Sequence, residues 1–105
     1  MAPTDRVKKA RKDARRDAAA AHQLALWYSR GEEGLCQDFQ LAVRWELEAA
    51  ERKCADAQYT LGAWYRYGAM GLPVDHAAAF VWIQKAALQG RAFRLTRVRF
   101  FISST

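Results

Sequence analysis

The chain repeats itself once with a period of 37 residues, and this repeat limits its fold more than any other feature. Residues 24–50 align with residues 61–87 without a gap, and eleven of the aligned positions are identical. A period between 20 and 50 residues is typical of solenoids, whose units bury their apolar faces by stacking on one another. Solenoids present extended surfaces to partners. The repeat therefore predicts a binding scaffold.

Each copy has the pattern of two helices joined by a turn. In the second copy, five positions recur at spacings of three and four residues and share one helical face, namely Ala57, Leu61, Trp64, Tyr65 and Gly68. Gly68 also suits the left-handed residue that ends a helix. Asp75 is a good N-cap for a second helix, whose apolar stripe holds Ala79, Trp82, Ala86 and Ala87. The first copy repeats this pattern, so we predict two helical hairpins, over residues 18–54 and 55–91.

The residues before the first hairpin also have helical spacing. Thr4 or Asp5 can cap a helix, and an alanine-rich apolar stripe starting at Val7 runs on into the first copy. We therefore expect one long helix from Asp5 to Arg30, whose first half forms a basic extension over residues 1–17.

A third copy of the repeat begins near the end of the chain and stops. Val98, Phe101 and Ile102 stand 37 residues after Leu61, Trp64 and Tyr65. Residues 92–105 are thus interpreted as a partial third repeat, with a lone helix over 92–102 that closes the stack, because an open solenoid end has to be covered. The alternation within residues 96–100 also permits a strand.

These residues resemble the Sel1-like repeat, a relative of the tetratricopeptide repeat. The second copy carries nearly the whole motif, in Leu61-Gly62, Tyr65, Gly68, Gly71, Asp75, Ala79, Trp82, Lys85-Ala86-Ala87 and Gly90. The first copy departs from it, with Ala25 in place of the first glycine. The resemblance implies an all-α, right-handed α/α solenoid of helix-turn-helix repeats. It also implies a scaffold or adaptor that binds a protein or peptide without catalysis, and it names no partner.

Two sets of residues are candidates for a partner-binding surface. In such solenoids the first helix of each repeat lines the concave face. The side of these helices opposite the core stripe carries His22, Leu26 and Arg30, then Tyr59, Ala63 and Tyr67. Tyrosine and arginine are enriched at interface hot spots, although ordinary solvated surface is an equal alternative. Trp27 and Trp64 lie at the edge of the apolar stripe, where core packing is the favoured interpretation and a partner contact is the alternative. Trp45 and Trp82 are predicted to pack in the core.

The chain has no pattern typical of an enzyme or a cofactor site. The two histidines, His22 and His76, lie on different predicted helices, and neither a metal-binding Cys or His spacing nor a phosphate-binding glycine loop occurs. We predict no catalytic residue, no cofactor and no metal.

Positive charge is concentrated at the two ends of the chain. The formal net charge is +6, and it divides into +4 for residues 1–17, −2 for residues 18–90 and +4 for residues 91–105. The basic segment over residues 6–16 supports an alternative function, nonspecific nucleic-acid binding, with the repeats as a spacer. It has no interleaved aromatic residues, so a solvated charged helix is the favoured interpretation.

The cysteine count and the hydropathy pattern point to a cytoplasmic protein. Cys36 and Cys54 bracket a predicted helix and would stand on the order of 20 Å apart, too far for a disulfide. Free thiols favour a reducing compartment. No apolar run approaches the roughly 18 residues of a membrane span, and no secretory signal is visible. Two and a half repeats fall short of the three or so that a stable array needs. Either the flanking helices act as caps, or the protein self-associates, or the chain is a shortened relative of a longer array.

Overall fold

The computed structural model describes the backbone of residues 2–103 and the side chains of residues 2–89. Five α-helices follow one another over this part of the chain: α1 (Asp5–Asp13), α2 (Ala18–Arg30), α3 (Phe39–Glu51), α4 (Ala55–Tyr67) and α5 (His76–Ser103). No strand occurs within residues 2–103. The fold is therefore all-α, as the repeat predicted.

The ends of the repeat helices follow from the residues at which the two copies agree. Gly31 and Gly68 end α2 and α4 in the left-handed conformation, with φ of 68° and 66°. Asp38 caps α3 by accepting a hydrogen bond from the amide of Leu41, and Asp75 caps α5 through the amide of Ala78. These four predicted helix boundaries are confirmed.

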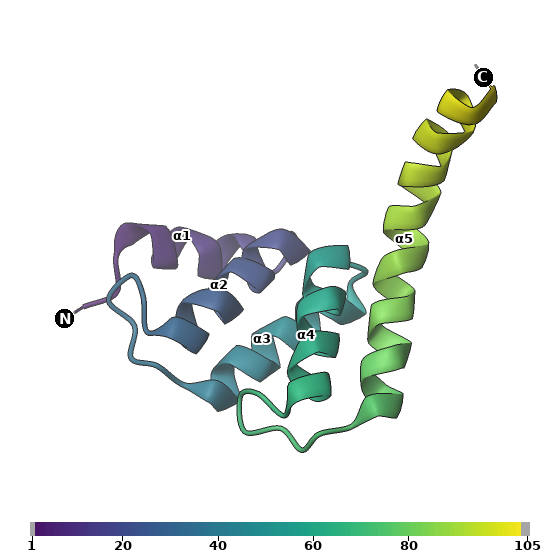
Figure 1. The fold of residues 1–105 in the computed structure, drawn as a ribbon. Helices are drawn as coiled ribbons and strands as arrows, with labels where there is room; N and C mark the ends of the chain where they lie inside the picture. The colour runs from purple at the N-terminus through teal and green to yellow at the C-terminus, as the bar shows by residue number, and fades with distance from the viewer. Residues whose placement is uncertain (1, 104–105) are drawn as a thin grey trace.

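The helices stack in chain order, each against the next (Figure 1). Helices α2 and α3 form the first hairpin, α4 and the start of α5 form the second, and α3 packs against α4 between them. Gly62 lets α5 approach α4 closely, since a Cβ atom there would lie 2.5 Å from Cγ1 of Ile83. Trp45 and Trp82 pack against the core, as predicted.

The expected single helix from Asp5 to Arg30 is wrong, because the chain turns between Asp13 and Ala18. Asp17 takes an extended conformation and accepts a hydrogen bond from the amide of Ala19, which starts α2 anew. The turn folds α1 back on α2 and buries the stripe of Val7, Ala10 and Ala14, which a straight helix would leave in water. Burial of this stripe is the physical reason for the break.

A separate C-terminal helix over residues 92–102 is also not what the structure shows. That segment is helical, but it continues α5 without a break through Gly90. In Figure 1 the yellow end of α5 extends beyond the other helices. The side chains expected to close the stack, those of Val98, Phe101 and Ile102, lie outside the described side chains.

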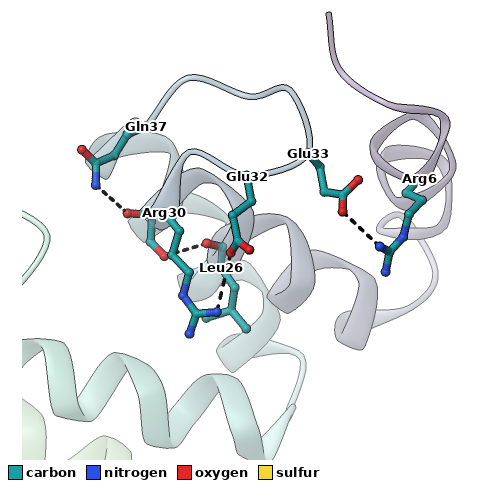
Figure 2. A network of polar contacts seen from close by, with 7 residues as sticks. Arg6, Leu26, Arg30, Glu32, Glu33 and Gln37 are labelled. Atoms are coloured by element: carbon teal, nitrogen blue, oxygen red, sulfur yellow. Dashed lines mark hydrogen bonds and ion pairs between the residues drawn. The ribbon is translucent and has the colours of Figure 1, made fainter. Parts of the chain in front are cut away.

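The loop that follows α2 is held by side chains from three elements (Figure 2). Arg6 on α1 forms an ion pair with Glu33 at 3.0 Å, and Thr4 donates a hydrogen bond to the same carboxylate. Gln37 donates to the carbonyl of Ser29, and Arg30 lies 3.6 Å from Glu32. The basic first segment is thus fastened to the first repeat.

Candidate functional site

The residues predicted for a binding surface in the first repeat are largely enclosed by the fold. His22 points toward α3, where its Nδ1 lies 2.5 Å from Oε1 of Glu46. Trp27 is buried in the core, and the guanidinium of Arg6 lies over its ring. Leu26 is half-buried, whereas Arg30 is exposed. The first repeat therefore offers little of the predicted surface to a partner.

Glu46 is an unexpected buried acid in this repeat. Its side chain has no exposed surface, and its Oε2 atom has no hydrogen-bond partner among the described residues. The hydrogen bond to Glu46 raises the pKa of His22 against the opposing effect of burial, and burial raises the pKa of Glu46. Both shifts make the pair hold a proton to a higher pH than isolated side chains would.

The corresponding residues of the second repeat lie on the surface. Tyr59 and Tyr67 are 61% and 72% exposed, and Ala63 lies half-buried between them on the same side of α4. Trp64 is half-buried and packs against the core. Of the eight predicted residues, these tyrosines are the large apolar side chains that remain open to solvent.

An open groove of about 590 Å³ lies between α4 and α5 on this side of the second repeat. Its lining is mostly apolar and consists of Arg66, His76, Ala79, Phe80, Ile83, Gln84 and Ala87. Phe80 is 66% exposed, which is unusual for phenylalanine in a small domain. We call this surface the α4–α5 groove.

The residues that line the α4–α5 groove have equivalents 37 positions earlier, in the first repeat, where another helix packs against α3. Phe80, Ile83 and Ala87 stand 37 residues after Val43, Glu46 and Ala50. In the first repeat α4 packs against α3, and His22 on α2 contacts Glu46. Glu46 and Ala50 are 0% and 1% exposed there, and Val43 is half-buried. In the second repeat Ala87 is exposed and Ile83 half-buried. Among the described residues, the second repeat has no later helix packed against α5 as α4 packs against α3.

The other end of the stack is closed. The buried stripe of Val7, Ala10 and Ala14 on α1 has the same spacing as Val43, Glu46 and Ala50 on α3. Helix α1 packs against α2 and α3 packs against α4, while Glu46 of the second stripe also pairs with His22 on α2. Helix α1 thus covers α2 in the way that α3 covers α4, and the α4–α5 groove is the uncovered end.

The sequence predicted the tyrosines of α4 but missed Phe80 and Ile83. Neither belongs to the apolar stripe of Ala79, Trp82, Ala86 and Ala87 that the repeat pattern identifies. The signal available in the sequence was their repeat-equivalence to Val43 and Glu46, together with the incompleteness of the third copy. An apolar residue at a stacking position is exposed where no further helix packs against it.

The described residues also bear on metal binding, disulfides and membrane-spanning helices. No group of three potential metal ligands is present there, and Cys36 and Cys54 are both free. No helix in the described part of the chain is long and apolar enough to cross a membrane.

Comparisons with known proteins agree with this arrangement of repeats. The family model of the Sel1 repeat matches residues 18–54 and residues 55–90, which correspond to the two hairpins. A search of curated proteins and a search of solved structures gave no match. Sel1 repeats are generally protein-interaction modules without catalytic activity. Since the matched residues make up more than half of the sequence, the chain belongs to the Sel1 repeat family.

Proposed function

We propose that this chain is a protein-interaction module that binds a helical segment of its partner in the α4–α5 groove. The observation that carries the proposal is the exposure of Phe80 beside half-buried Ile83, at positions whose equivalents in the first repeat lie on α3, which packs against α4. Tyr59 and Tyr67 stand exposed on α4 and extend the apolar surface. Exposed aromatic side chains beside an apolar groove are typical anchors of protein interfaces.

The partner-binding residues differ from those expected on sequence grounds. Tyr59, Ala63 and Tyr67 remain in the proposed surface, and Phe80, Ile83 and Ala87 join them. His22 and Trp27 are not part of it, because His22 contacts Glu46 and Trp27 is buried in the core. The sequence predicted an extended surface along both repeats, whereas the proposed surface is confined to α4 and α5 at the end of the stack.

Site-specific photo-cross-linking tests this proposal. A photoreactive phenylalanine analogue at Phe80 should cross-link a partner in extracts of the native source, and the same analogue at Phe39 should not. Phe39 is a matched control because it is also an exposed aromatic residue but lies on the first repeat. The purified partner should then bind at least about tenfold more weakly to Phe80→Ala and Tyr67→Ala than to Phe39→Ala. Equal binding by all three variants would locate the surface elsewhere.

The alternative function, nucleic-acid binding by residues 6–16, has no support from the family match, and the structure changes how it can be tested. Deleting residues 1–17 would strip the buried stripe of Val7, Ala10 and Ala14 from the core. Exchanging the exposed Lys8, Lys9 and Lys12 for glutamine removes charge and leaves that stripe in place. Salt-dependent DNA or RNA binding that these exchanges abolish would favour the alternative.

A further inference from the structure

We propose that the α4–α5 groove is filled by residues 92–102 of a second copy of this chain, in a reciprocal dimer. This inference rests on the proposed function, because it names the occupant of the same groove. It starts from the first repeat, where the equivalent groove holds a helix of defined type. Helix α4 lies there, and it presents the first-helix pattern of the repeat to α2 and α3.

The occupant of the second groove must therefore resemble α4, and the chain carries one further segment of that kind. Leu61, Trp64 and Tyr65 on α4 have Val98, Phe101 and Ile102 as their equivalents 37 residues later. The lengths also agree, since α4 has 13 residues and α5 continues for 13 residues beyond Gly90. Either helix spans about 20 Å.

The path of the backbone keeps this segment away from the groove of its own chain. Between α3 and α4 the chain reverses at Arg52, Lys53 and Cys54, and Lys53 adopts a positive φ of 70°. The equivalent of Lys53 is Gly90, which lies inside α5. Since α5 runs straight through Gly90, residues 92–102 continue along its axis and do not return over α4 and α5 (Figure 1).

A segment that leaves its own groove empty is free to enter the groove of another copy. When two copies exchange such segments, each groove is covered by the contacts that the repeat would make within one chain, and the assembly closes with twofold symmetry. The residue at the hinge is glycine, which tolerates both the helical conformation and the reversal. Exchange of the two segments at Gly90 thus covers the α4–α5 groove of each copy and packs residues 92–102 of each copy.

The solution mass of paired variants tests the exchange. The chain of 105 residues should have twice the mass of one copy by light scattering. Phe80→Asp damages the groove and Phe101→Asp damages the segment, so each variant alone should be a monomer with unchanged helical circular dichroism. An equimolar mixture of the two should form a dimer, because one copy supplies an intact groove and the other an intact segment. With one contact left, this dimer should dissociate at a concentration about 100-fold or more above that of the wild type.

Two further measurements separate the exchange from its alternatives. Phe39→Asp should remain a dimer, and Gly90→Ala, which favours a straight α5, should be a dimer at least as stable as the wild type. A labelled peptide of residues 91–105 should bind to the Phe101→Asp chain and not to the Phe80→Asp, Phe101→Asp double variant.

A monomeric wild type, or a mixture that stays monomeric at every concentration, overturns the exchange. The cross-linking experiment at Phe80 is independent of this result. A monomer that still cross-links a different partner there would keep the proposed function and reject the second copy as the occupant.

Discussion

Glu46 on α3 lies fully buried with its Oε1 atom 2.5 Å from Nδ1 of His22 on α2, at positions where the second repeat has Ile83 and Tyr59. The first repeat thus holds an ionisable pair where the second repeat is apolar. Asp56 on α4 is the further charged group that acts on both members of the pair. A buried pair of this kind adds little net stability when intact, but loss of one partner is costly.

The pair makes stability depend on pH. The pKa of His22 is raised in the folded chain, so the stabilisation is complete below the unfolded value of about 6.5 and is lost as the pH rises through the folded value. The raised pKa of Glu46 acts in the same direction. Urea unfolding at pH 6 and at pH 9 should therefore give the lower free energy of unfolding at pH 9. A stability that increases over this range would contradict the assignment.

Removing His22 alone should be strongly destabilising. His22→Ala leaves Glu46 buried without its partner, and we expect a loss of about 3–5 kcal/mol in the free energy of unfolding. The triple variant His22→Tyr, Ala25→Gly, Glu46→Ile copies the residues of the second repeat, including the glycine that admits Ile83. It should recover most of this loss and show no pH dependence between pH 6 and pH 9. If the single variant is as stable as the wild type, the pair does not form in solution.

Helix α1 should be an integral part of the fold. Val7 is fully buried against α2, so Val7→Ala should reduce the free energy of unfolding by about 2 kcal/mol in urea. Lys8→Ala changes the neighbouring exposed residue and serves as the control, with an expected effect below about 0.5 kcal/mol. Equal effects of the two substitutions would mean that α1 is detached.

The hairpins could be predicted because the 37-residue repeat fixes their helix ends twice, at Gly31 and Gly68 and at Asp38 and Asp75. The turn before α2 could not be predicted in the same way. A helical stripe from Val7 onward has the same spacing whether the helix runs straight or folds back, since both forms are helical. The N-cap type of Asp17 was the local signal, and the burial of the stripe decided the outcome.

The candidate groove was only half predictable. Tyr59 and Tyr67 were identified because they lie opposite the core stripe of α4. Phe80 was not, because its exposure depends on which helix follows α5 in space, and a pattern within one helix does not contain that information. The pairing of His22 with Glu46 was missed for the same reason, as the two residues are 24 positions apart on different helices.

The two aspartate caps should contribute equally to the two hairpins. Asp38 accepts from the amide of Leu41 at 3.1 Å, and Asp75 accepts from the amide of Ala78 at 3.0 Å. Alanine at either position should lower the free energy of unfolding by about 1 kcal/mol, and the double variant by about 2 kcal/mol. Asparagine keeps the acceptor and is the control. Alanine variants as stable as the asparagine variants would show that the caps are not formed.

Two equivalent glycines should respond differently to alanine. Gly34 and Gly71 have positive φ angles of 78° and 74°, so alanine is strained at either position. At Gly71 a Cβ atom would meet nothing within 4 Å, and we expect a cost of about 1 kcal/mol from the backbone alone. At Gly34 it would lie 2.0 Å from the carbonyl oxygen of Ala2, because the chain before α1 crosses this loop.

Gly34→Ala must therefore displace the segment that precedes α1 and should cost at least about 1 kcal/mol more than Gly71→Ala. Thermal unfolding of both variants measures the difference. The cause can be isolated by repeating the comparison in a chain that lacks Ala2 and Pro3, which removes the atoms that the new Cβ would meet. In that background the two substitutions should have the same effect, because only the shared backbone strain remains. A difference that persists would show that the Ala2 carbonyl is not what restricts Gly34.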